Sequence, residues 1–153
     1  MAKDLLKLDD QLCFALYRAS RAVIRSYTPL LNELGLTYPQ YLVMLVLWEQ
    51  DCISVTDIGE RLILDSATLT PLLKKLEQRK LLTRNRSKSD ERVVKVKLTV
   101  EGVGLRKNAT KIPLALTCAL GIDLSLTTDR NHINKLRDEL QKLASDIELK
   151  EAR

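Results

Sequence analysis

Residues 54–98 read SVTDIGERLILDSATLTPLLKKLEQRKLLTRNRSKSDERVVKVKL, and this stretch decides the fold. Ser54 and Asp57 have the spacing of a helix-capping box, which predicts a short helix running through Leu62. Residues 65–66 are polar and offer caps for a second helix shortly afterwards. Two short helices separated by a tight turn form a helix-turn-helix.

The second of these helices has two different faces. The turn before it falls at residues 63–64, and Pro71 lies about one turn inside it. Because proline removes a backbone hydrogen bond, we expect the helix to be kinked or to begin later than its cap indicates. Leucines at helical spacing are expected to face inward and cations outward: Leu69, Leu72, Leu73 and Leu76 against Lys74, Lys75 and Arg79.

The spacing of apolar residues changes from a helical to a strand-like period between Leu82 and Leu98. Val94 and Val96 alternate with lysines there, and the polar residues 87–91 supply a turn, which predicts a β-hairpin. Cations occupy its tip and flanks: Arg84, Arg86, Lys88, Arg92, Lys95 and Lys97. A cationic ribbon directly after a helix-turn-helix is typical of a wing.

Positive charge is concentrated in this part of the chain. Residues 54–100 contain 11 Lys or Arg and six Asp or Glu, whereas the other 106 residues contain 14 of each sign, so the net charge of +5 falls in the middle. Such a localised excess indicates a phosphate-binding face. A solvated charged face is the commoner meaning of a charge run, so the surrounding pattern has to decide.

Two helices are expected before the helix-turn-helix. Residues 5–31 repeat apolar or small side chains on one helix face, and Pro29 and Gly35 mark the end region of that helix. Thr37 opens a second capping box before residues 41–48, which are apolar almost all round and predict a buried central helix.

Further helices are expected after the hairpin. Thr99 caps one that runs to about Ile112, Pro113 interrupts it, and a short helix covers about residues 114–120. The last helix begins near Thr128. It has a narrow apolar seam of Ile133, Leu136, Leu140, Leu143 and Ile147, and the first helix has a similar stripe of Leu5, Leu8, Leu12, Ala15, Ala19 and Ala22. Both ends thus present more apolar surface than one small domain covers, and we expect a homodimer.

The composition bounds the fold class. The 153 residues have the length of one domain, and 45% hydrophobic with only 4% aromatic residues favours a mainly helical fold with a small β-hairpin wing. The longest apolar run, Leu42–Trp48, is far shorter than the roughly 20 residues that span a bilayer, so we expect a cytoplasmic protein with no membrane contact. Three cysteines without framework spacing indicate reduced thiols, so a disulfide here would be a switch.

Together these residues resemble the MarR-type regulators, and more narrowly the two-cysteine members of their organic-hydroperoxide-responsive repressor branch (OhrR). The similarity covers nearly the whole chain and is strongest in Leu12–Tyr17 (LCFALY), Leu36–Tyr41 (LTYPQY), Leu64–Lys75 (LDSATLTPLLKK), and Asp90–Arg92 with Leu98, Thr99 and Gly102. The resemblance implies a winged helix-turn-helix homodimer with residues 1–153 as a single domain. Residues 1–31 and 114–153 would dimerise, and residues 54–100 would bind DNA.

The resemblance also assigns contacts with double-stranded operator DNA. Residues of the recognition helix that meet major-groove bases would be Ser66, Ala67, Thr68 and Thr70. Arg92 falls where a wing arginine enters the minor groove, with Asp90 placed to orient it. The remaining cations would contact the DNA as well: Lys74, Lys75, Arg84, Arg86 and Lys88. The alternative is that Ser66 and Thr68 only cap the helix and that Arg92 only pairs with Asp90.

Cys13 lies on the first expected helix, with Tyr17 one turn along it. Tyr27 is 14 residues away, about 21 Å at the helical rise, so within one chain it cannot touch Cys13. The resemblance implies an antiparallel crossing of two first helices, which surrounds the thiol with Tyr17 of one subunit and Tyr27 and Tyr38 of the other. Phenolic donors favour the thiolate, which attacks a peroxide oxygen.

The other cysteines receive different assignments. The resemblance implies that Cys118 resolves the oxidised thiol of the other subunit into a disulfide, with an organic hydroperoxide as the oxidant. Cys52 has no counterpart in the resemblance and is expected to be incidental. The alternative for Cys13 is a small buried core residue, which is what cysteine usually is.

Other functions remain open. A MarR-type regulator could sense a small aromatic ligand in the dimer cleft, with the cysteines in the core. A thiol peroxidase could use Cys13, but the single histidine, His132, is expected on the polar side of the last helix, so we expect no enzyme. A nonspecific architectural protein would bind all DNA sequences almost equally. The sequence has neither a glycine-rich phosphate loop nor Cys/His metal-ligand spacing, so we expect no cofactor and no metal.

Overall fold

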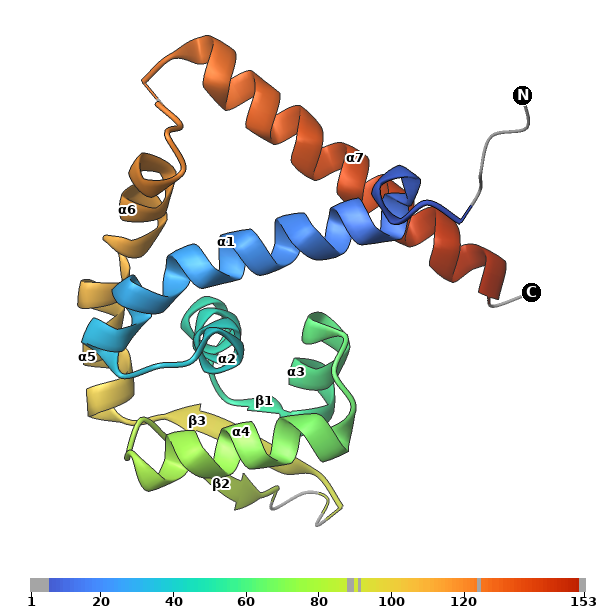
Figure 1. Ribbon diagram of the computed structural model, residues 1–153. Helices are drawn as coiled ribbons and strands as arrows, with labels where there is room; N and C mark the ends of the chain where they lie inside the picture. The colour runs from blue at the N-terminus through green and yellow to red at the C-terminus, as the bar shows by residue number, and fades with distance from the viewer. Residues whose placement is uncertain (1–5, 88–89, 91, 124, 152–153) are drawn as a thin grey trace, which may run out of the picture. The chain divides into compact units, whose positions relative to one another are not determined.

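The computed structural model describes residues 6–87, 90, 92–123 and 125–151, and the chain forms two compact units, residues 1–113 and 114–153. The helices of the first unit are α1 (Leu12–Leu34), α2 (Tyr38–Glu49), α3 (Val55–Leu62), α4 (Ser66–Gln78) and α5 (Val100–Ala109) (Figure 1). Its strands are β1 (Ile53–Ser54), β2 (Leu82–Arg86) and β3 (Val94–Leu98). α6 (Ile112–Ala119) begins at the boundary, and α7 (Thr127–Glu151) fills most of the second unit.

The expected caps set the starts of the helices. The backbone N–H of Asp57 donates to Ser54 Oγ at 3.0 Å, and that of Ser54 donates to Asp57 Oδ2 at 3.1 Å, which completes the capping box of α3. Asp65 caps α4 by accepting from the Thr68 N–H at 2.6 Å. Each cap satisfies backbone donors that the first helical turn leaves unpaired. The helix-turn-helix and its tight turn are therefore confirmed.

Some helix boundaries differ from the expectation. α1 begins at Leu12 after a short 3-10 turn at Leu8–Asp10, and it continues through Pro29 to Leu34. Gly35 caps it with a φ of +63°. α4 likewise runs through Pro71 without a break. A proline removes one helical hydrogen bond, and here the bonds on either side and the buried apolar face of each helix keep the helix intact.

Helix α5 ends earlier than the sequence predicted. α5 ends at Ala109, whereas the sequence predicted a helix to about Ile112 with Pro113 as the interruption. Pro113 instead occupies the first turn of α6. Proline suits a first turn because the missing N–H has no helical partner there. The expected start of the last helix near Thr128 is confirmed within one residue by α7.

The hairpin belongs to a three-stranded antiparallel sheet with the order β1-β3-β2. β2 and β3 pair in a register that places Leu82 opposite Leu98 and Arg84 opposite Val96. β1 adds Ile53 opposite Val96 on the other edge. The sequence predicted the hairpin but not β1, because two residues are too short to show an alternating pattern.

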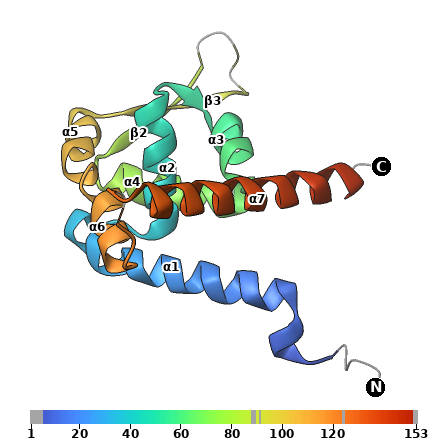
Figure 2. The same cartoon turned by 90° about the horizontal axis from the view of Figure 1, so that it is seen from above.

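The core of the first unit is organised around α2. Side chains on several faces of this helix are buried, among them Val43, Met44, Val46, Leu47 and Trp48. α1 crosses one side of α2, while α4 and the sheet lie on the other side (Figure 1). The β2–β3 hairpin extends away from α1 (Figure 2). The core also contains Leu31, Leu34, Ile58, Leu69, Leu73, Leu76, Leu82 and Val96. The unit therefore holds its outer elements through one shared helix.

The second unit consists mainly of α7, a helix of 25 residues. Its apolar seam is partly open: Leu136, Leu140 and Ile147 are 44%, 41% and 49% exposed. A single helix has no neighbour of its own to bury such a seam. Within the part of the chain that the structure describes, no helix combines the length and the apolar character needed to cross a membrane.

Two glycines of α5 provide a matched test of the packing between α5 and the sheet. Trp48 Nε1 donates to the Gly102 carbonyl oxygen at 2.9 Å, and a Cβ at Gly102 would lie 1.9 Å from the Leu81 carbonyl oxygen. A Cβ at Gly104 would meet nothing within 4 Å. Gly102→Ala should therefore lower the free energy of unfolding by about 3 kcal/mol or more, because backbone has to shift. Gly104→Ala should raise it by about 0.5–1 kcal/mol through helix propensity. Urea denaturation of both variants measures this difference, and equal stabilities would contradict it.

Candidate DNA-binding surface and cysteine site

α4 carries short side chains at its exposed N-terminal end. Ser66, Ala67 and Thr68 are exposed at its N-terminal end. Thr70 is half-buried, and its hydroxyl donates to the Ser66 carbonyl oxygen at 2.7 Å. Short side chains at this end let the helix backbone approach base edges closely. Lys74 and Lys75 are exposed further along the same helix.

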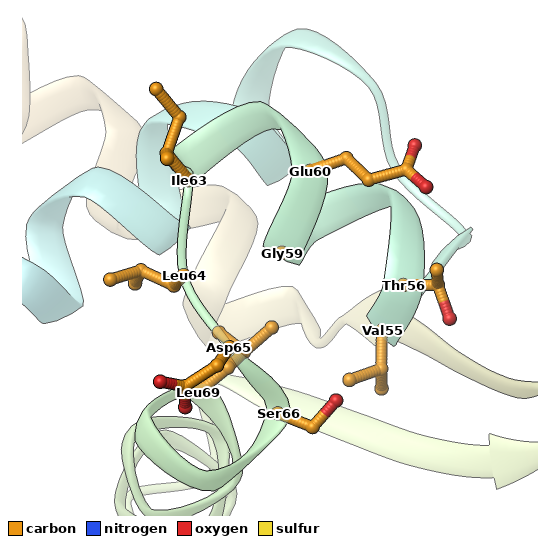
Figure 3. Close-up of a pocket in the computed structure, with 9 residues that line it drawn as sticks. All are labelled: Val55, Thr56, Gly59, Glu60, Ile63, Leu64, Asp65, Ser66 and Leu69. Carbon is orange, nitrogen blue, oxygen red and sulfur yellow. The ribbon is translucent and has the colours of Figure 1, made fainter. Parts of the chain in front are cut away.

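A cleft of about 520 Å³ opens between α3 and α4 beside this N-terminal end (Figure 3). Its lining includes the hydroxyls of Thr56 and Ser66 but also the carboxylates of Glu60 and Asp65. Hydrogen bonds from the Thr68 N–H lower the pKa of Asp65, so this carboxylate is charged at neutral pH. The two carboxylates disfavour a bound anion in the cleft.

The wing carries its cations near the end of the hairpin. Arg92 is exposed, and its backbone N–H donates to Asp90 Oδ1 at 2.9 Å. Asp90 therefore holds the backbone of Arg92, which is a different contact from the side-chain pair that the sequence left as the alternative. Arg86 is exposed at the end of β2, and Lys88 lies outside the described residues.

Arg84 of the wing has a partner within the protein. It is half-buried, and its Nη2 and Nε donate to Glu77 Oε2 at 2.7 and 3.0 Å, while its backbone N–H donates to Glu77 Oε1 at 3.0 Å. Arg84 lowers the pKa of Glu77, so the pair is ionic at neutral pH. The guanidinium therefore fastens β2 to the last turn of α4, and its contact with DNA stays a prediction.

Two lysines lie on the outer face of the sheet. Lys95 and Lys97 are exposed on β3, opposite Asn85 and Thr83 of β2. Because side chains alternate along a strand, these four polar residues share one face, while Leu98 and Val96 face the core. The outer face of the wing is therefore cationic.

Cys13 is exposed near the start of α1. Tyr17 lies one turn along, 55% exposed, and its hydroxyl accepts from Arg21 Nη1 at 2.8 Å. At helical spacing Cys13 shares its face of α1 with Tyr27 and Leu31. Leu31 is only 1% exposed, so this face of α1 is buried in the core at the C-terminal end of the helix. At the N-terminal end, where Cys13 lies, the same face is exposed.

Tyr27 belongs to an aromatic cluster with the start of α2. Its ring centroid lies 4.9 Å from that of Tyr38 and 5.9 Å from that of Tyr41, and Trp48 lies 6.3 Å from Tyr41. Burial raises the pKa of Tyr27 to about 12, with further contributions from Tyr38 and Tyr41. Burial raises the pKa of those two phenols as well. All three are therefore neutral at physiological pH and can donate hydrogen bonds.

Sequence reasoning named Tyr27 and Tyr38 but missed Tyr41. Tyr38 and Tyr41 are three residues apart in LTYPQY, which is the spacing of neighbours on a helix face. The structure brings these three tyrosines together, and it leaves Cys13 and Tyr17 at the other end of α1. This is the arrangement that the length of the helix required within one chain.

The other cysteines are also exposed free thiols, Cys52 after α2 and Cys118 on α6 in the second unit. Cys52 has a φ of +59°, and its backbone N–H donates to Asp51 Oδ1 at 2.7 Å. Among the described residues, no group of three His, Cys, Asp or Glu side chains is arranged to hold a metal ion.

Comparison with known proteins identifies the family. Residues 25–108 match the model of the transcriptional regulator SarA/Rot family. The chain is 50% identical over 124 residues to an organic hydroperoxide resistance transcriptional regulator of Bacillus subtilis, which covers 79% of this chain and 84% of the relative. The chain belongs to the MarR/SarA-like winged-helix family of transcriptional regulators.

Further members of the MarR/SarA-like family agree with this assignment. The HTH-type transcriptional regulator TtmR of Methylorubrum extorquens is 46% identical over 143 residues, 93% of this chain and 73% of the relative. Among solved structures, reduced AbfR bound to DNA superposes with a TM-score of 0.79 at 33% identity, covering 96% of this chain and 99% of the other. The chain is therefore a DNA-binding transcriptional regulator of winged-helix fold and not an enzyme.

The tyrosine cluster of this MarR/SarA-like regulator should make its free energy of unfolding decrease at alkaline pH. The unfolded chain ionises its tyrosines near their ordinary pKa of 10, whereas folded Tyr27 holds its proton to about 12. Because the unfolded state loses the proton first, stability should be complete below pH 10 and should fall between pH 10 and 12. Denaturant unfolding at pH 9, 10 and 11 measures the slope. Tyr27→Phe should flatten it, and an unchanged slope in this variant would contradict the assignment.

Proposed function

We propose that this regulator is a redox-sensing repressor that leaves its operator when Cys13 is oxidised by an organic hydroperoxide. The observation that carries the proposal is the position of Cys13. The thiol is exposed in the N-terminal half of α1. It lies on the same face of the helix as Tyr27, which is in the C-terminal half. A second α1 crossing in the opposite direction would place neutral phenols over the thiol.

The names of the relatives support a response to oxidants. The Bacillus subtilis relative is an organic hydroperoxide resistance regulator. Solved structures of AbfR include a reduced form and an overoxidized form, both bound to DNA, and a disulfide-formed one. The disulfide-formed structure matches with a TM-score of 0.65 at 35% identity over 92% of this chain. Cysteine oxidation therefore belongs to the chemistry of a close structural relative.

The proposed assembly is a homodimer that functions as one MarR-type domain, residues 1–153, in each subunit. Residues 1–31 and 114–153 would form the interface, and residues 54–100 would bind DNA. The exposed apolar residues at both chain ends support this arrangement, among them Leu8, Leu12, Leu136, Leu140 and Ile147. Burying a leucine side chain contributes about 1.5–3 kcal/mol, so a few of them per subunit provide a substantial driving force for association.

The proposed chemistry begins with the Cys13 thiolate. Its sulfur attacks one peroxide oxygen, an S–O bond forms while the O–O bond breaks, and an alcohol leaves after taking up a proton. The sulfur loses two electrons and the peroxide gains them. The resulting sulfenic acid then reacts with the thiol of Cys118 of the other subunit, which forms a disulfide and releases water.

The proposed sensor pocket consists of Tyr17 from one subunit and Tyr27 and Tyr38 from the other. The raised pKa values support a donor role for Tyr27 and Tyr38, because a phenol that stays protonated can donate to a thiolate. Disulfide formation would draw Cys13 away from the phenols and change the spacing of the two recognition helices.

In the proposed DNA complex, two recognition helices read a pseudo-palindrome with half-sites about 34–36 Å apart. Ser66, Ala67, Thr68 and Thr70 would meet major-groove bases, and Arg92 would enter the minor groove with its backbone held by Asp90. The proposed contacts from the other cations come from Lys74, Lys75, Arg84, Arg86 and Lys88.

A second candidate is a regulator that binds a small aromatic ligand. A cavity between α2 and α5 supports it, lined by Tyr41, Leu45, Trp48, Arg106 and Ala109 among others. PcaV of Streptomyces coelicolor, solved with its natural ligand, matches with a TM-score of 0.76 at 25% identity, covering 95% of this chain and 98% of the other. The cavity measures about 160 Å³, below the roughly 300 Å³ at which ligand sites begin, so the redox proposal is favoured.

The two proposed modes of wing contact predict different mutant behaviour. Arg92→Ala should weaken operator binding by about 1–3 kcal/mol and relax the preference for A/T pairs flanking the half-sites, because a minor-groove arginine reads groove width. Lys95→Ala should weaken binding to all sequences similarly and reduce the salt slope by about one. Fluorescence anisotropy on operator and random duplexes at several salt concentrations measures both. If the two variants behave identically, the wing assignment is wrong.

The cysteine variants test the sensing chemistry. With cumene hydroperoxide, the wild type should release its operator and form a disulfide-linked dimer that dithiothreitol reverses. Cys13→Ser should bind DNA normally and ignore the oxidant, whereas Cys118→Ser should still form the sulfenic acid and then bind a small thiol or advance to sulfinic acid. Gel shifts, non-reducing gels and mass spectrometry read these outcomes. Oxidant-driven release by the Cys13→Ser protein would refute the proposal, and release without a linked dimer would refute only the role of Cys118.

A further inference from the structure

A side chain from the end of the recognition helix holds the C-terminal end of α1. Arg79 directly follows α4, and its Nη2 donates to the Leu34 carbonyl oxygen at 3.0 Å. Its Nη1 donates to the carbonyl oxygen of Gly35. In Figure 1 the C-terminal ends of α1 and α4 lie on the same side of the first unit. The helix that carries Cys13 and the helix that faces DNA are thus directly hydrogen-bonded.

The end of α1 is shaped to receive this guanidinium. The N–H groups of Gly35 and Leu36 donate to Asn32 and Leu31 at 2.9 and 3.0 Å, which satisfies two of the last carbonyls of the helix. The carbonyls of Leu34 and Gly35 are left for Arg79. A Cβ at Gly35 would lie 2.7 Å from Nη2 of Arg79. A cation at this end is also favoured by the helix dipole, and the planar fork reaches two carbonyls at once.

The same end of α4 is also bonded to the wing. Glu77, in the last turn of α4, holds Arg84 of β2 through the ion pair described above, with Nη2 at 2.7 Å from Oε2. Two contacts two residues apart on α4 therefore join it to α1 on one side and to β2 on the other. A displacement of the end of α1 would act on both DNA-contacting elements together.

We propose that Arg79 is a positioning residue that transmits the movement of α1 to the recognition helix and the wing when Cys13 is oxidised. This inference rests on the proposed redox function. α1 is one uninterrupted helix, so a displacement at Cys13 reaches Leu34, about 32 Å away at the helical rise, without being absorbed by a break. Arg79 passes it on because it contacts the last carbonyls of the helix rather than its side.

The test compares the operator Kd of the reduced and the hydroperoxide-treated full-length protein. Allosteric coupling commonly changes affinity by roughly 5–150-fold. In Arg79→Ala the ratio of oxidised to reduced Kd should fall at least about fivefold relative to the wild type. Sulfenic acid trapping by mass spectrometry should meanwhile show that Cys13 is oxidised at the same rate. A purely structural role would lower the melting temperature and leave the ratio unchanged.

Arg61→Ala is the matched control, because Arg61 forms an ion pair with Glu49 that joins α3 to α2 rather than to α1. It should leave the ratio at the wild-type value. Arg79→Lys keeps the charge but not the fork, and an intermediate ratio in this milder variant supports the inference even where Arg79→Ala folds poorly. A wild-type ratio in both folded Arg79 variants overturns the inference alone. If the wild type itself stays on DNA after Cys13 is oxidised, both the proposed function and this inference fail.

Discussion

The burial of α2 is the constraint on which the rest of the first unit depends. A helix that is apolar almost all round has to be covered on every side, and here α1, α3, α4 and α5 provide that cover. Each of these helices keeps a polar face because only one of its faces is needed. The position of the exposed face of α4 follows from this, since Leu69, Leu73 and Leu76 point into the core and the opposite face points outward.

The orientation of the wing is set by apolar packing against the core and by one ion pair. Leu82, Val96 and Leu98 bury one face of the sheet, and alternation then places Lys95 and Lys97 on the other. The Glu77 and Arg84 ion pair adds a directional bond between α4 and β2. A half-buried bidentate pair restricts orientation more than a surface pair would, because the fork geometry of the guanidinium allows few arrangements. The last turn of α4 and strand β2 are thus directly bonded to each other.

The two halves of α1 lie in different environments. Its C-terminal half packs in the core through Leu31 and Leu34, while its N-terminal half carries Cys13 and Tyr17 in the open. A core cysteine would be shielded from oxidants, whereas a thiol on an uncovered helix face is accessible and can still be surrounded when a partner arrives. The neutral phenols at the other end of the helix suit such a partner, because donors stabilise a thiolate and an ionised phenol would repel it.

Several features could be predicted from the sequence because they depend on near neighbours. Capping boxes, the helix-turn-helix and the change of period at the hairpin involve residues within about four positions of each other, and all were found. The separation of Cys13 from Tyr27 likewise followed from helix length alone. The resemblance of the LCFALY and LTYPQY segments added the expected roles.

Only the tertiary structure decided which partner each polar side chain takes. Arg84 pairs with Glu77, and Tyr41 joins the tyrosine cluster. Arg79 bridges to Leu34 and Gly35, more than 40 positions away. The physical reason is that the sequence gives the spacing of a polar side chain along its own helix or strand but not its partner on a distant element. Its partner is set by the packing of apolar helices around α2, which brings distant backbone carbonyls and carboxylates within reach.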